Sequence, residues 1–197
     1  MKVTRKMTID TKMFELGDVI SFKLTTGEKV QARAVQETPE GMLFITVDCL
    51  KDKQPMFKNP DRMGSVQINY FNSELRHILN KEILDTFPEE IKNRMAAMRI
   101  GNTDAFDLLR IPTEKEIFGM NPHGQAENDN GEQFKGMKNH RNRIAWQGSK
   151  SNTWEWYWLQ NRIEDSASIF ALVGDDGGAS YDYASNSRGV RPVFLLS

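Results

Sequence analysis

The C-terminal stretch of the sequence places the strongest constraint on the fold. The segment from Gly174 to Phe194, GDDGGASYDYASNSRGVRPVF, changes character abruptly at Gly189. Before this glycine the side chains are mostly small and polar, with two tyrosines, and after it they are largely apolar through Leu196. An apolar run bounded by a glycine is typical of a buried strand. The chain must therefore bury its last strand while a polar turn or surface directly precedes it.

Further strands are predicted at both ends of the chain. Two N-terminal segments flank a Thr-Thr-Gly-Glu turn and predict a hairpin, and a third apolar segment follows a Pro-Glu-Gly turn. These segments are Val19–Leu24, Glu28–Val35 and Met42–Cys49. We expect them to form a β-meander within residues 1–60. Near the C-terminus the predicted strands are Trp154–Leu159, Ser168–Val173, Ala179–Ala184 and Val190–Leu196.

The middle of the sequence predicts helices. Ser73 is a good N-cap for Glu74–Ile83, whose leucines and isoleucines repeat at helical spacing. Pro88 suits the first turn of a second short helix. Thr113 and Glu116 have the spacing of a capping box for a third helix. Strands, then helices, then strands without regular βαβ alternation predict an α+β fold.

The charge balance argues against two classes of partner. The 26 Lys and Arg residues nearly cancel the 27 Asp and Glu residues, so no net field attracts nucleic acid or an anionic membrane. The basic cluster within residues 135–143 lacks a nucleic-acid-binding motif and is interpreted as a solvated face. The sequence shows no signal-peptide core and no apolar run that could span a bilayer. We expect a cytoplasmic or phage-particle-associated protein, with surface display by a non-classical route left open.

The sequence does not indicate metal or cofactor chemistry. The single cysteine, Cys49, excludes an intramolecular disulfide and ends an apolar strand, which predicts a buried, inert thiol. The three histidines show no metal-binding spacing. Residues 128–132, Asn-Asp-Asn-Gly-Glu, resemble only half of a calcium loop. We predict no cofactor and no metal, with calcium at 128–132 left open.

An enzyme remains an alternative interpretation. The long polar loop over residues 119–142 contains His140, and the turn before the last two strands contains Asp175 and Asp176. If the fold brings these groups together in a pocket, they could perform acid–base chemistry between the loop and the C-terminal hairpin.

Three segments carry a resemblance to a known family. Arg110–Glu116, RIPTEKE, resembles the RLPTEAEWE segment of formylglycine-generating and related C-type-lectin-like domains. Tyr157–Leu159 and Gly189–Phe194 resemble the YWLRSP and GVRPAFWL motifs of a family of largely uncharacterised bacterial and phage proteins with the same lectin-like fold. The variable proteins of diversity-generating retroelements are a related group. The resemblance covers roughly residues 66–197 and implies a C-type-lectin-like domain over residues 61–197.

The resemblance does not extend to the enzymes of that superfamily. The C-terminal half lacks the cysteine pair of formylglycine-generating enzymes, and the histidine triad of iron-dependent sulfoxide synthases is absent. The calcium–sugar motifs of animal C-type lectins are also missing. After Tyr157–Leu159 the chain reads Gln-Asn-Arg instead of Arg-Ser-Pro, which puts the local turn in doubt. Without these catalytic and calcium-binding motifs, the resemblance implies only that the fold acts as a binding scaffold.

In the variable proteins, the residues just before the terminal strand form the ligand surface. The resemblance therefore implies a non-catalytic recognition module, in which tyrosines anchor a protein or glycan ligand within a polar rim. The residues expected to form this surface are Asn161, Arg162, Glu164, Asp165, Ser180, Tyr181, Asp182, Tyr183, Ser185, Asn186 and Ser187. Two alternatives stay open, which are an ordinary polar hairpin and a structural subunit of a phage-type assembly. The oligomeric state is not predicted.

Structural roles are expected for the other motif residues. Trp158, Arg191 and Pro192 are assigned to the scaffold, and Arg191 is expected to pair with a buried carboxylate or with backbone carbonyls. The row of Trp154, Trp156 and Trp158 is expected to lie in the core rather than to form a sugar-stacking platform.

Overall fold

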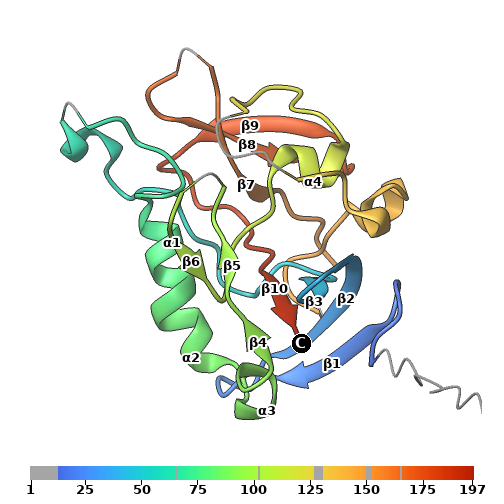
Figure 1. Ribbon diagram of the computed structural model, residues 1–197. Coiled ribbons are helices and arrows are strands. Elements are labelled where there is room, and N and C mark those ends of the chain that lie inside the picture. Colours follow the sequence, from blue (N-terminus) through green and yellow to red (C-terminus); the bar gives the residue numbers. More distant parts are fainter. Residues whose placement is uncertain (1–12, 65, 102, 127–130, 150–151, 165) are drawn as a thin grey trace, which may run out of the picture.

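The computed structural model describes residues 13–64, 66–101, 103–126, 131–149, 152–164 and 166–197. These residues form an α+β fold with a larger, curved sheet below a smaller sheet, and helices at their sides (Figure 1). Within this part of the chain, no helix has the length and apolar character needed to cross a membrane.

The larger sheet joins the two ends of the chain. Its strand order is β1-β2-β3-β10-β4, and every pairing is antiparallel. The strands are β1 (Val19–Lys23), β2 (Lys29–Thr38), β3 (Gly41–Thr46), β10 (Val193–Leu196) and β4 (Met95–Ala96). The predicted N-terminal hairpin and third strand are confirmed. The last strand of the chain thus lies between β3 and β4, with Phe194 opposite Phe44.

Strand β10 is buried on both faces. Phe194 and Leu196 belong to the apolar core that includes the helix residues Leu75 and Leu79. Val193 and Leu195 face a second core, which continues into the smaller sheet. This double burial explains why every residue after Gly189 up to Leu196 is buried, and it confirms the burial expected from the apolar run.

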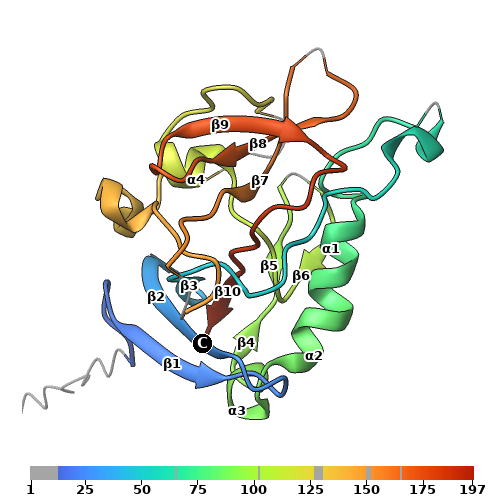
Figure 2. The same cartoon turned by 180° about the vertical axis from the view of Figure 1, so that it is seen from behind.

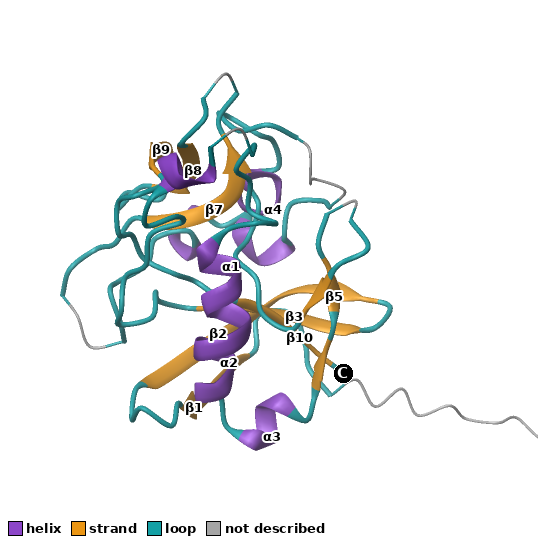
Figure 3. Ribbon diagram, turned by 90° about the vertical axis from the view of Figure 1, so that its left-hand side faces the viewer, coloured by secondary structure: helices purple, strands orange, loops and turns teal. Residues whose placement is uncertain are grey.

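One nearly continuous helix covers a face of the larger sheet (Figure 3). It consists of α1 (Glu74–Ile78), a π-helical turn (Leu79–Ile83) and α2 (Leu84–Thr86). The Ser73 hydroxyl accepts a hydrogen bond from the Arg76 amide at 3.0 Å, so the predicted N-cap is confirmed. The helix extends to Thr86, and α3 (Glu89–Lys92) follows Pro88.

The smaller sheet has the order β7-β8-β9 and lies above the larger one (Figure 2). Its strands are β7 (Tyr157–Arg162), β8 (Ile169–Val173) and β9 (Ala179–Tyr183). Helix α4 (Glu114–Phe118) packs against β7 and starts with the predicted capping box, which is present in full. The remaining elements are β5 (Met98–Arg99), β6 (Phe106–Asp107) and 3₁₀ turns at Pro60–Met63, Lys135–Met137 and His140–Asn142.

The expectation that all three tryptophans of the row lie in the core is wrong. Only Trp158 is fully buried, while Trp156 is half-buried and Trp154 is exposed over 48% of its surface. The physical reason is a local pairing: Trp154 forms an isolated β-bridge with Trp146 on the segment just before it, and β7 begins only at Tyr157. Trp158 has the predicted scaffold role, and its indole N–H donates to the Gln54 carbonyl at 2.8 Å.

Cys49 should react with thiol reagents only when the protein unfolds. Its side chain is buried, and burial raises the pKa of the thiol well above its usual value. A methyl group on Gly189 would lie 2.6 Å from the Cys49 Sγ, so the backbone closes over the sulfur. We expect Cys49 labelling by a chromogenic disulfide reagent to be slow in the native protein and fast in urea. Rapid stoichiometric labelling of the native protein would contradict this placement.

Candidate functional site

Two tyrosines stand on the exposed side of the strand β9. Tyr181 and Tyr183 are exposed over 53% and 59% of their surface and are separated by one residue, so both rings project from the same side of the strand. Strand β9 is the last in its sheet, and its outer edge has no strand partner within the described residues. The exposed rings therefore border an open strand edge.

The loop after α4 supports the first tyrosine. The imidazole of His123 meets the Tyr181 ring edge to face, with ring centroids 5.2 Å apart. This loop is held from below by the buried carboxylate of Glu114, which accepts hydrogen bonds from the amides of His123 at 3.3 Å and of Gly124 at 2.7 Å. Sequence reasoning missed Glu114; its position directly after the N-cap Thr113 was the available signal.

Asn161 and Arg162 do not belong to the exposed surface, and their predicted place there is corrected. Both side chains are buried in β7. The Asn161 Oδ1 accepts from the Glu114 amide at 2.8 Å, and its Nδ2 donates to the Gln125 carbonyl at 2.9 Å. The Arg162 guanidinium donates to the Gln125 side chain at 2.7 Å. From the interior, these two side chains hold the loop that carries His123 in place through their hydrogen bonds to Gln125.

Asp182 organises the turn that follows the strand. Its carboxylate accepts hydrogen bonds from the Arg188 guanidinium at 2.6 Å, the Asn186 amide group at 2.7 Å and the Tyr183 backbone N–H at 2.8 Å. Partial burial alone would raise the pKa of Asp182, but these three hydrogen bonds outweigh it and hold the pKa below its usual value. The Arg188 guanidinium lies 5.0 Å from the centre of the Trp156 ring. The turn is therefore fixed in one shape.

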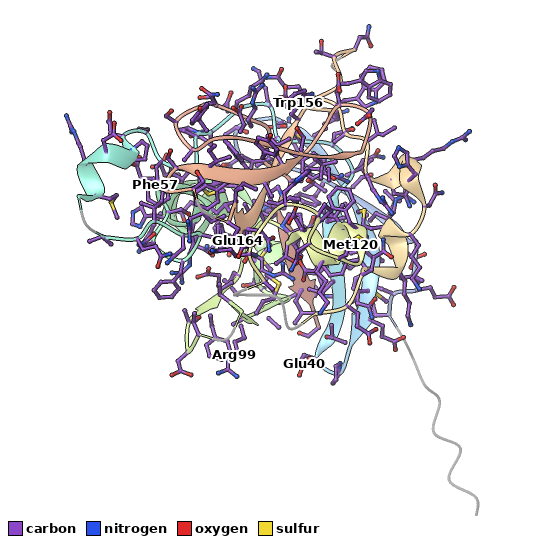
Figure 4. All side chains as sticks on the ribbon, turned by 90° about the horizontal axis from the view of Figure 1, so that it is seen from above. Glu40, Phe57, Arg99, Met120, Trp156 and Glu164 are labelled. Atoms are coloured by element: carbon purple, nitrogen blue, oxygen red, sulfur yellow. The ribbon has the colours of Figure 1, made fainter. Side chains whose placement is uncertain are left out.

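The remaining predicted surface residues are distributed around this turn. Ser185, Asn186 and Ser187 are exposed, and Ser180 is half-buried. Because the Asn186 side chain bonds to Asp182, which projects from the opposite side of β9, the turn is adjacent to the tyrosine pair rather than part of one flat face. Glu164 is exposed after the end of β7 and is labelled in Figure 4. Asp165 lies outside the described residues.

A comparison with protein families identifies the chain. A family model described as "Domain of unknown function (DUF6273)" matches residues 40–197. The chain belongs to the DUF6273 family. A search of curated proteins and a search of solved structures each gave no match. The part matched by DUF6273 starts in the turn between β2 and β3, and it contains both the central strand pair β3–β10 and the tyrosine pair.

In this DUF6273 chain, His140 of the alternative enzyme site contacts the backbone of Asp176. The His140 Nε2 lies 2.7 Å from the backbone carbonyl of Asp176, while the Asp176 carboxylate accepts from the Gly178 amide at 2.8 Å. Asp175 and Asp176 are exposed on the tight turn between β8 and β9, and the exposed His140 lies on a neighbouring 3₁₀ turn. These contacts stabilise the turn. Among the described residues, no group of three or more His, Cys, Asp or Glu side chains could hold a metal ion, and residues 128–130 lie outside them.

Proposed function

We propose that the chain is a non-catalytic recognition module, and that Tyr181 and Tyr183 anchor its protein or glycan ligand. The observation that carries this proposal is the exposure of both phenol rings on one side of an edge strand. Tyrosine is enriched at binding hot spots because it offers a large amphipathic surface while few rotatable bonds must be fixed. An ordinary polar hairpin has no need for two neighbouring exposed rings.

The rigidity of the surroundings supports the same proposal. Strand β9 is paired with β8 over its full length, from Ala179 opposite Val173 to Tyr183 opposite Ile169. His123 packs against one ring, and the hydrogen bonds of Asp182 fix the following turn. Anchors that are already held in place lose less entropy on binding, which favours affinity.

We also propose that the scaffold is C-type-lectin-like. The segments that carry the resemblance have structural roles here: Arg110 and Glu116 form a buried ion pair, and Gly189–Phe194 leads into and begins the central strand. The intervening segment Ser180–Ser187 is mostly exposed or half-buried. A buried interior with an exposed polar segment before the last strand is the arrangement that the resemblance to the variable proteins implies.

Replacing both tyrosines should abolish recognition without unfolding the protein. We expect the variant Tyr181→Ala/Tyr183→Ala to bind at least about 30-fold more weakly, equivalent to roughly 2 kcal/mol, because hot-spot side chains have effects of this size. Labelled wild-type protein and the double variant would be applied side by side to glycan and protein arrays. The strongest hit would then be titrated by calorimetry.

Phe106→Ala provides the matched control, because Phe106 is an exposed aromatic residue on β6. This variant should bind as the wild type does, and all variants should keep the wild-type melting temperature. If the double variant retains every array signal of the wild type, the tyrosine pair is not the recognition surface. If the wild type forms a stable oligomer that the double variant does not form, the structural-subunit alternative is favoured.

A further inference from the structure

A second candidate site is an open pocket of about 420 Å³ on a different part of the surface. It lies where β2 and the loop after β3 meet the 3₁₀ turns that follow Phe134, a segment that Figure 1 shows beside β2. Its lining includes Arg33, Asp48, Arg141, Trp146 and Trp154. None of these residues contributes to the tyrosine surface described above.

One wall of the pocket is aromatic. Trp146 and Trp154 face each other across an isolated β-bridge, with ring centroids 4.2 Å apart and an interplanar angle of 53°. Nearly half of Trp154 is exposed to solvent. The indole ring is the largest apolar side-chain surface available, so an exposed one at a pocket rim favours stacking of a ring-shaped ligand.

The polar side of the pocket carries two arginines with unused hydrogen-bonding capacity. Arg33 on β2 and Arg141 on a 3₁₀ turn line the pocket, and within the described residues neither guanidinium has a hydrogen-bond or ion-pair partner. The buried Arg191 also reaches the lining, but its guanidinium already donates to backbone carbonyls. A guanidinium presents a planar fork that matches a carboxylate or a phosphate. The pocket is therefore prepared for an anionic group.

Asp48 adds a hydrogen-bond acceptor beside these arginines. The Asp48 Oδ1 accepts a hydrogen bond from the Trp146 backbone amide at 3.1 Å, which holds the carboxylate next to the two tryptophans. Loss of hydration on burial raises the pKa of Asp48, although the Trp146 hydrogen bond and the nearby Arg191 charge oppose this. A fixed acceptor suits a ligand hydroxyl, whereas it repels a ligand with several phosphates.

We propose that this pocket binds an acidic sugar, a hydroxyl-bearing ring with one carboxylate. The ring stacks on Trp154, the carboxylate is held by Arg33 and Arg141, and a ring hydroxyl donates to Asp48. A neutral sugar lacks the partner for the arginines, and a carboxylate on an apolar ring lacks the hydroxyl for Asp48. The proposal does not depend on the tyrosine surface, so either can fail alone.

The test is a titration of the whole chain with sodium glucuronate, followed by tryptophan fluorescence and by calorimetry. We expect saturable binding with a dissociation constant of about 1 mM, as is reasonable for one small ring with few contacts. Glucose, which lacks the carboxylate, and cyclohexanecarboxylate, which lacks the hydroxyls, should each bind at least about tenfold more weakly. The variant Tyr181→Ala/Tyr183→Ala should bind glucuronate as tightly as the wild type.

Three substitutions test the assigned contacts. Arg33→Gln, Arg141→Gln and Trp154→Ala should each weaken glucuronate binding by about tenfold or more, since each removes a charged hydrogen bond or the stacking surface. Arg62→Gln, at an exposed arginine on the first 3₁₀ turn, is the matched control and should leave binding unchanged. All four variants should melt as the wild type does. The proposal is overturned if glucuronate shows no saturable binding, if glucose or cyclohexanecarboxylate binds equally well, or if the pocket variants bind like Arg62→Gln.

Discussion

Replacement of Arg191 by alanine is expected to lower the free energy of unfolding by about 3–5 kcal/mol, because a buried charged donor is lost and a cavity is left in its place. The guanidinium donates to the Thr46 carbonyl at 3.0 Å, to the Asn142 and Arg143 carbonyls at 3.2–3.3 Å, and to the Tyr157 hydroxyl at 2.9 Å. Arg191 therefore connects β3, the end of the last 3₁₀ turn and β7. Its loss removes these donors from the Thr46 and Asn142 carbonyls, while the Arg143 carbonyl keeps the Tyr157 hydroxyl as a donor.

Urea titration followed by circular dichroism measures this loss. Arg188→Ala is the matched control, because Arg188 makes a partly exposed ion pair with Asp182 and should cost about 1 kcal/mol or less. The predicted pairing of Arg191 with backbone carbonyls is confirmed by the geometry. A normal urea midpoint for Arg191→Ala would show that the guanidinium is not a structural connection.

Replacement of Glu116 by alanine should destabilise the protein by a similar amount, about 3–5 kcal/mol. Glu116 and Arg110 form a buried, two-pronged ion pair with N–O distances of 2.5 and 2.7 Å. The same carboxylate accepts from the Thr113 amide at 2.9 Å, so it also completes the capping box of α4. One substitution thus removes the partner of a buried charge and a helix cap.

Two further variants separate the contribution of the ion pair from that of the helix cap. In the variant Arg110→Met/Glu116→Leu no buried charge of the pair remains, and we expect a smaller loss of stability than in Glu116→Ala. Thr113→Ala, which removes only the cap hydroxyl, should cost about 1 kcal/mol. If the double variant is less stable than Glu116→Ala, the ion pair itself contributes net stability beyond the cap.

The local features of the fold could be predicted because their signals lie within a few residues. Ser73 and the pair Thr113 and Glu116 mark helix starts through hydrogen bonds over three positions, and both are present. The apolar run after Gly189 predicts burial without any knowledge of the partner strands. The exposure of Tyr181 and Tyr183 agrees with their predicted place on the surface.

Features that depend on which segments pair or cover one another could not be predicted in the same way. Trp154 alternates with polar neighbours as a core strand does, yet its position is decided by a bridge to Trp146. Asn161 and Arg162 are polar and therefore expected outside, but both are buried beside the loop over residues 121–125, where each donates a hydrogen bond to Gln125. A single sequence does not reveal which loop covers which strand. The polar character of these two residues therefore predicts exposure, although the fold buries them.

The position of β10 between β3 and β4 also affects the order of folding. Phe194 pairs with Phe44, about 150 positions away, whereas β1, β2 and β3 are joined by short turns. Because closure of such a long loop has a high entropic cost, we expect the meander to form first and β10 to pair with β3 later. During that interval the apolar edge of β3 is an unpaired template for other chains. Aggregation during refolding should therefore rise with protein concentration, and a chaperone that shields this edge should raise the yield.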